Sequence, residues 1–234
     1  MTDTASKPLS RRTLIRTLGA STCVVGFNAG ASSWVTAAAA GTDARFCNLP
    51  PLQGTLHLDR TTRTAYAQDF GDIVHEYPLA VLKPGSVHDV RRMLAFAQQH
   101  GIRVVGRGRG HTVFGQSQLR AGIVIDISTL QTIHHITEDR AVVDAGMRWN
   151  TLLAATLQRG LMPPALTDYI GQTVGGTLSV GGVGGMIHRH GAQVDNVLEL
   201  QVLTGRGDLI TCSETRRRLL FDAVLAGQGD VGGI

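Results

Sequence analysis

The chain carries Gly106-Arg107-Gly108-Arg109-Gly110-His111 directly after residues 102–105, which predict a short buried strand. Glycines at alternate positions let consecutive backbone N–H groups converge on one anion, such as a pyrophosphate. The stretch departs from the three-glycine dinucleotide fingerprint, because His111 stands where the third glycine would be needed. Taken alone it indicates a nucleotide cofactor only weakly, and an ordinary tight turn is the alternative.

A second glycine-rich stretch runs from Thr173 to Gly185 and holds six glycines among thirteen residues. Its hydroxyl side chains could bind phosphate or the polar atoms of a ring. A flexible linker is the alternative, but apolar residues recur too regularly for a solvated spacer. Two such loops in one domain strengthen the prediction of a nucleotide cofactor.

The segment before the first glycine stretch predicts a strand, a helix and a second strand. The apolar run 79–82 stops before Pro84, and Ser86 predicts a helix N-cap with Asp89 at the third helical position. Apolar residues then follow on one helical face, and Gly101 predicts the end of the helix. This order favours a parallel pair of strands joined by a right-handed crossover.

Further elements follow in a mixed α and β order. Residues 149–159 predict an amphipathic helix, and Gly205 to Gly207 predicts a hairpin turn. The predicted strands cover residues 122–128, 141–145, 197–204 and 208–212. Residues 41–75 are polar and weakly patterned, so we expect an extended lead-in with short strands at best.

Composition excludes several classes of protein. With 234 residues and 43% hydrophobic content the chain can bury a core, so it is not wholly disordered. The net charge of +4 comes with only 5% aromatic residues, so we expect no nucleic-acid partner. The three cysteines lack CxxC spacing, and His188 and His190 lack a convergent carboxylate, so we expect no metal site. His134 and His135 are expected on the surface.

The amino terminus reads as a twin-arginine signal. Arg11 and Arg12 precede a long uncharged stretch that ends in small residues near 38–40, where we expect cleavage. A membrane-anchoring helix is the alternative, but glycines and hydroxyl residues make the stretch too polar to span a membrane well. We therefore expect export to the periplasm or medium, with no stable membrane anchor. This route carries folded proteins, which suits a cofactor inserted before export.

Three segments together resemble the FAD domain of the cytokinin dehydrogenases, in the wider vanillyl-alcohol oxidase and p-cresol methylhydroxylase family. They are GRGRGHTVFGQ at 106–116, LTDYIGQTVGGTLSVGGVGG at 166–185 and HRHGAQVDNVLELQVLTGRGDLITCS at 188–213. The resemblance runs from about Tyr77 to the last residue. It implies an α+β fold, a p-cresol methylhydroxylase-type FAD-binding domain made of two small α/β subdomains.

The resemblance also implies the site residues. A histidine in this loop is joined to the 8α carbon of the flavin in the family, and His111 occupies its place. Asp168 matches the catalytic aspartate, which would accept a proton or hydrogen bond from a substrate amine during hydride transfer to the flavin. Thr112 replaces the usual Ser. The implied cofactor-binding residues are Gly106, Gly108, Arg109, Gly110, His111, Thr112, Gln116, Asp168, Thr173, Ser179 and Val183.

By this resemblance the chain is an FAD-dependent oxidoreductase that oxidises an N6-substituted adenine amine. Alternatives are a sugar, lactone or alcohol oxidase of the same superfamily, with a small-molecule amine or alcohol as substrate, and a flavin-binding remnant without activity. Family members continue into a substrate-binding domain, whereas this chain stops at Ile234, and Asp230 and Gly233 depart from the usual residues. We therefore expect a signal peptide at 1–40, the lead-in at 41–75 and an FAD-binding domain at 76–234, with the substrate domain missing.

Overall fold

The computed structural model describes residues 24–28, 33–36, 44–229 and 233. The chain divides into two compact units, with the boundary in the sequence between Leu49 and Pro50. In the first unit β1 (Val24–Asn28) and β2 (Ser33–Thr36) pair antiparallel, and the 3-10 helix η1 (Ala44–Asn48) follows. The predicted twin-arginine motif and cleavage region lie outside the described residues.

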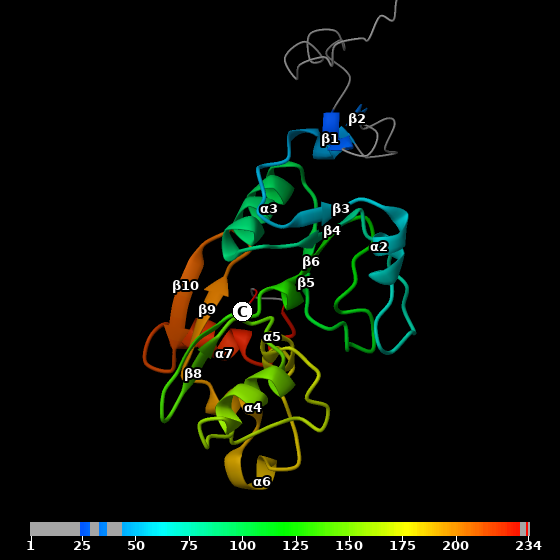
Figure 1. Ribbon diagram of the computed structural model, residues 1–234. Coiled ribbons are helices and arrows are strands. Elements are labelled where there is room, and N and C mark those ends of the chain that lie inside the picture. The colour runs from blue at the N-terminus through cyan, green and yellow to red at the C-terminus, as the bar shows by residue number, and fades with distance from the viewer. Residues whose placement is uncertain (1–23, 29–32, 37–43, 230–232, 234) are drawn as a thin grey trace, which may run out of the picture. The chain divides into compact units, whose positions relative to one another are not determined.

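The second unit begins with a four-stranded sheet (Figure 1). Its strands lie in the order β3 (Thr55–His57), β4 (Ala80–Lys83), β6 (Ile123–Asp126) and β5 (Val104–Arg107). β3 is antiparallel to β4, whereas β4 and β5 both run parallel to β6. β4 and β5 run parallel, as predicted, but they do not pair with each other, because β6 lies between them. The central strand β6 is buried along its whole length, as a parallel strand covered on both faces should be.

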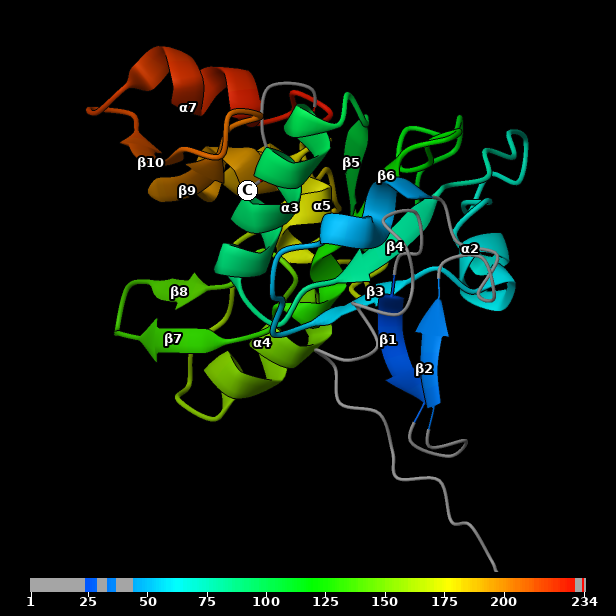
Figure 2. The ribbon, with the colours of Figure 1, turned by 90° about the horizontal axis from the view of Figure 1, so that it is seen from above.

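Helix α3 (Val87–Gln99) connects β4 to β5 and packs its apolar face inward. Its buried residues include Val90, Met93 and Ala97, which the sequence spacing predicted on one face, and Phe96, which it did not. The Nε atom of Arg91 donates to the Gly207 carbonyl, 3.0 Å away, and so joins α3 to the later part of the unit. Figure 2 shows α3 between that later part and α2 (Arg60–Ala65).

The predicted N-cap of α3 is confirmed, but Asp89 acts in a way that the sequence did not indicate. Ser86 is the N-cap, but its side chain makes no capping hydrogen bond. Asp89 is fully buried, and its carboxylate accepts hydrogen bonds from the backbone N–H groups of Gln53 (2.9 Å), Gly54 (2.7 Å) and Gly85 (2.9 Å). Burial raises the pKa of Asp89, but these hydrogen bonds outweigh it and hold the pKa below its ordinary value. The carboxylate fastens the segment before β3 to α3.

The lead-in is more structured than its sequence indicated. The short strand β3 agrees with the expectation, but the expectation of strands at best was wrong for residues 60–65, which form α2. Asp59 caps this helix by accepting a hydrogen bond from the Thr62 N–H group at 2.8 Å. Since α2 buries none of its residues, no apolar periodicity could reveal it.

The later part of the second unit contains two antiparallel strand pairs and several short helices. The pairs are β7 (Ile133–Ile136) with β8 (Ala141–Val143), and β9 (Glu199–Leu203) with β10 (Leu209–Ser213). The helices are α4 (Trp149–Leu157), α5 (Val174–Leu178), α6 (Ile187–His190) and α7 (Arg218–Val224), with 3-10 turns η2 (Ile127–Thr129) and η3 (Gln193–Asn196).

These elements share a hydrophobic core of their own. It is formed by Met147, Trp149, Leu152, Val174, Leu178, Leu200, Val202, Cys212, Phe221 and Val224. The predicted helix and the predicted strand pair around Gly205–Gly207 are confirmed, and Gly207 adopts a left-handed φ of 85° in that turn. β7, α5 and α7 were not expected. The unit therefore contains two small α/β subdomains, as the resemblance implied.

Candidate functional site

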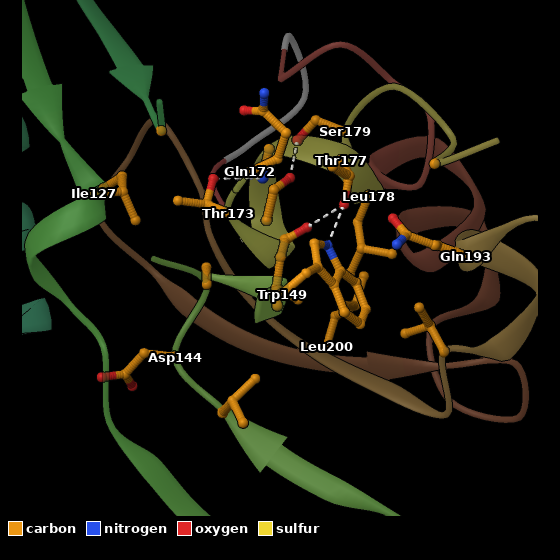
Figure 3. Close-up of a pocket in the computed structure, with 18 of the residues that line it drawn as sticks. Ile127, Asp144, Trp149, Gln172, Thr173, Thr177, Leu178, Ser179, Gln193 and Leu200 are labelled. Atoms are coloured by element: carbon orange, nitrogen blue, oxygen red, sulfur yellow. Dashed lines mark hydrogen bonds between the residues drawn. The ribbon is translucent and has the colours of Figure 1, made fainter. Parts of the chain in front are cut away.

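A cleft of about 1750 Å³ is lined by residues from both subdomains. The four-stranded sheet contributes the loop that follows β5, and the later subdomain contributes the β7–β8 hairpin, residues 161–165 and α5. Figure 3 shows the part of the wall around α5 and Trp149.

None of the helices in the described ranges is long and apolar enough to cross a membrane.

The cleft brings together nearly all the site residues that the sequence indicated. Its wall includes Gly106, Gly108, Arg109, Gly110, His111, Thr112, Gln116, Thr173, Ser179 and Val183. Asp168 is exposed and is not among the lining residues, although its neighbours Thr167 and Tyr169 are. The structure thus unites two stretches that lie far apart in the sequence, and the role of Asp168 stays a prediction.

The two glycine-rich stretches touch each other at the cleft. A Cβ atom at Gly108 would overlap the Oγ1 atom of Thr173, the residue that begins α5. Gly110 has a left-handed φ of 65°, and a Cβ atom there would overlap the guanidinium of Arg107. Glycine is therefore favoured at both positions, because a Cβ atom would crowd Thr173 or Arg107.

A positive charge lies beneath this loop. The Arg107 guanidinium is 5.0 Å from the Tyr66 ring centre, and the Tyr66 hydroxyl donates a hydrogen bond to Asp126. Burial lowers the pKa of Arg107, but an arginine stays charged in proteins. Burial and the bond to Asp126 raise the pKa of Tyr66, so the phenol is neutral. The cation favours an anionic group near the loop.

His111 is exposed beside the cleft and contacts two aromatic rings. Its ring centre lies 4.0 Å from that of Phe70, with 24° between the ring planes, and 5.3 Å from that of Tyr169, with 26° between them. Both partners are themselves largely exposed. The imidazole is thus held in a defined plane while an edge stays accessible to a ligand.

A segment of the lead-in holds the His111 loop. The backbone N–H of Phe70 donates to the Gly110 carbonyl at 2.9 Å, and that of Gly71 donates to the Thr112 carbonyl at 3.0 Å. The Asp69 carboxylate accepts hydrogen bonds from the Thr112 hydroxyl at 2.7 Å and from the Gly115 N–H at 2.8 Å. These bonds pin both sides of the histidine.

The Asp69 carboxylate is buried, and it is ionised. Burial raises the pKa of Asp69, but its hydrogen bonds, led by the one from Thr112, outweigh this and lower the pKa below its ordinary value. Sequence reasoning missed Asp69 and Phe70. They lie in the weakly patterned lead-in, and nothing in the local sequence indicates a contact with residues some forty positions later.

The second glycine stretch forms a helix rather than a loop at residues 174–178. Thr173 is the N-cap, and its hydroxyl oxygen accepts a hydrogen bond from the Gly176 N–H at 3.3 Å. A Cβ atom at Gly175 would overlap the methyl group of Ala145. The glycines thus serve close packing, which outweighs their poor helix propensity.

Side chains of α5 and the turn after it form part of the cleft wall (Figure 3). The indole N–H of Trp149 donates to the Thr177 hydroxyl at 2.7 Å, and the Ser179 hydroxyl donates to the Gly175 carbonyl at 2.8 Å. Val183 is largely exposed. The hydroxyl oxygens of Thr177 and Ser179 are therefore held in fixed positions.

The histidine pairs lie on the surface. His134 and His135 are exposed at the edge of the cleft, and His134 Nε2 lies 2.8 Å from Asp144 Oδ1. His188 and His190 are exposed on α6. No group of three or more His, Cys, Asp or Glu that could hold a metal ion occurs in the part of the chain that the structure describes.

The contact between the glycine stretches predicts a stability effect. Gly108→Ala forces the new methyl group against the Thr173 hydroxyl, so we expect it to lower the free energy of unfolding by about 1–3 kcal/mol. Gly106→Ala is the matched control, because a Cβ atom at Gly106 meets nothing within 4 Å. Denaturant unfolding of both variants gives the comparison.

A double-mutant cycle tests whether the effect comes from this contact. Thr173→Ala removes the opposing hydroxyl, so the double variant Gly108→Ala/Thr173→Ala should lose less stability than the sum of the single variants. Additive losses would contradict a direct contact between the two stretches.

Comparison with known proteins gives three findings. Residues 78–213 match the FAD binding domain family. An oxidoreductase of Rhodococcoides fascians, named as ORF5 in the fasciation locus, is 44% identical over 181 residues, which are 77% of this chain and 41% of that protein. Cytokinin dehydrogenase 3 of Oryza sativa is 42% identical over 197 residues, covering 80% of this chain and 37% of the relative.

The fold is also similar to that of a solved structure. The crystal structure of 6-hydroxy-D-nicotine oxidase from Arthrobacter nicotinovorans superposes with a TM-score of 0.70 at 25% identity, covering 78% of this chain and 41% of that one. The chain spans about 34% to 41% of the length of the curated relatives it matches.

Proposed function

Since the chain belongs to the FAD binding domain family, we propose that it holds FAD covalently through His111 and forms the cofactor-binding part of a cytokinin dehydrogenase-like oxidoreductase. The substrate would be an N6-substituted adenine amine. The chain spans only 41% and 37% of these two relatives, so the activity of the whole protein is part of the proposal.

The residues of the cleft fit FAD. A pyrophosphate needs backbone N–H groups that it can approach without side chains in the way, and Gly106, Gly108 and Gly110 carry no side chains. The half-buried Arg107 cation, which already faces the Asp126 and Asp69 carboxylates, adds positive charge near the loop. The cleft volume of about 1750 Å³ leaves room for a dinucleotide.

Bound FAD would supply the acceptor for the hydride that leaves the substrate. The residues of this chain would bind and orient it: the loop 106–110 would hold the pyrophosphate, and Thr112 and Gln116 would support the loop. Further along the wall, Thr173, Ser179 and Val183 would lie beside the flavin. Asp168 would accept a proton or hydrogen bond from the substrate amine.

One observation carries this proposal. His111 lies directly after the bare loop, stands accessible at the cleft, and has its ring plane fixed by Phe70 and its loop by Asp69. A nucleophilic imidazole must be held in place while one nitrogen stays free to form a bond. Its surroundings meet both requirements.

A flavin-binding chain without activity of its own is the second candidate. Flavin reduction separates the two. Anaerobic mixing of the purified yellow chain with N6-substituted adenines, sugars and simple alcohols should bleach the oxidised flavin only with the adenines. Bleaching by a sugar or alcohol alone would contradict the proposed substrate, and no bleaching at all would identify the second candidate.

We also propose that residues 1–40 direct export through the twin-arginine route, which would place the protein in the periplasm or outside the cell. The support is the paired Arg11 and Arg12 ahead of an uncharged stretch that ends in alanines. Cell fractionation of the native chain tests it, and retention in the cytoplasm would contradict it.

A further inference from the structure

Two buried amide side chains in the cleft wall lack hydrogen-bond partners. Gln172 is 8% exposed and Gln193 is 2% exposed, and both line the cleft. The Nε2 atom of Gln172 and the Oε1 atom of Gln193 have no partner among the described residues. The second polar atom of the Gln193 side chain, Nε2, does have a partner and donates to the Ala165 carbonyl at 3.5 Å.

Unpaired amides in such a place indicate a ligand. Most buried polar side-chain atoms in proteins have a partner, because an unpaired one loses its bonds to water and gains nothing. Gln118 has an unpaired Nε2 atom too, but it lies outside the cleft wall. Its Oε1 accepts the Glu76 N–H at 2.9 Å, so this amide is partly paired within the protein.

Backbone hydrogen bonds hold the main chain of both glutamines. The carbonyl of Gln172 accepts a hydrogen bond from the Trp149 N–H at 3.1 Å, and the N–H of Gln193 donates to the Gly182 carbonyl at 2.9 Å. A Cβ atom at Gly182 would overlap the Gln193 amide, so this glycine makes room for it. Figure 3 shows Gln193 beyond Leu178, with Gln172 on the other side of that residue.

We propose that Gln172 and Gln193 are positioning residues that hydrogen-bond to bound FAD. FAD carries both kinds of complementary atom: carbonyl and phosphate oxygens that accept from the Gln172 amide, and hydroxyl or ring N–H groups that donate to the Gln193 carbonyl. The inference rests on the proposed function, since it takes FAD as the occupant of the cleft.

This role predicts opposite effects on the free and the FAD-bound protein. Gln172→Met and Gln193→Met keep the length of the side chain but remove the unpaired polar atoms, so the melting temperature of the FAD-free protein should stay the same or rise. The affinity for FAD should fall about tenfold in each, the typical effect of losing one buried hydrogen bond to a ligand.

The measurement uses the His111→Ala background, in which we expect FAD to bind reversibly because the proposed attachment point is removed. Titration with FAD, followed by quenching of its fluorescence, gives the affinity, and thermal unfolding without FAD gives the stability. Gln118→Met is the matched control. It removes a hydrogen bond within the protein, so it should lower the melting temperature of the FAD-free protein.

The outcomes separate this inference from the proposed function. Unchanged FAD affinity in Gln172→Met and Gln193→Met, with a loss of stability like that of Gln118→Met, would overturn the inference and leave the proposed function standing. Absence of FAD binding in the native chain and in the His111→Ala parent would refute the proposed function, and the inference with it.

Discussion

Replacement of His111 by alanine is expected to abolish covalent flavin completely, while FAD still binds reversibly to the folded chain. The imidazole is the proposed attachment point, and alanine has no nucleophilic atom. The bare loop at Gly108 and Gly110 and the Arg107 cation are unaffected, so the binding surface persists. A denaturing gel viewed under ultraviolet light should show a fluorescent band for the native chain and none for the variant.

The matched control is His135→Ala. His135 is an exposed histidine in the same cleft wall, but no ring contact of the kind that Phe70 and Tyr169 make with His111 is described for it. This variant should keep its fluorescent band, and peptide mass mapping of the native chain should place the flavin on the peptide that contains His111. A band of full intensity from His111→Ala would show that another residue carries the flavin.

Replacement of Asp168 by asparagine is expected to slow flavin reduction by the substrate about 10²- to 10⁴-fold, the usual effect of losing a general base. Asparagine keeps the shape of the side chain but cannot accept the proton of the substrate amine. Tyr169, the next residue, stacks on His111, so the chain brings Asp168 into the neighbourhood of the proposed flavin attachment. Anaerobic stopped-flow bleaching with excess substrate measures the rate.

The control for this experiment is Glu138→Gln, an exposed carboxylate in the same cleft wall that carries no proposed role. It should reduce at the native rate. Covalent flavin should be unchanged in both variants, which separates a loss of chemistry from a loss of cofactor. If Asp168→Asn reduced its flavin at the native rate, Asp168 would not be the general base.

Local sequence signals predicted those parts of the fold that local interactions determine. The periodicity of residues 87–97 identified α3, and the turn at Gly205–Gly207 identified the β9–β10 hairpin, because capping and alternation act within a few residues. α5 escaped prediction since its glycines give no helix signal. Its formation depends on the Thr173 cap and on packing against Ala145, which is distant in sequence.

In the candidate site, too, the residues set by local sequence could be predicted and those set by long-range contacts could not. The loop that ends in His111 could be recognised from its own residues, because alternating glycines are themselves the structural requirement. Phe70 and Asp69 could not, since their effect on the histidine comes only from folding two distant segments together. For Asp168 the sequence supplied a role through resemblance, and that role awaits the measurement above.

The three backbone hydrogen bonds on Asp89 bear on where this domain starts. A polypeptide trimmed to begin at residue 76 would lose the amides of Gln53 and Gly54, together with the edge strand β3. An anion would then remain inside the protein with most of its compensation gone, and water would have to enter or the carboxylate would have to take up a proton. Residues 50–57 are thus an integral piece of the architecture that supports the cleft.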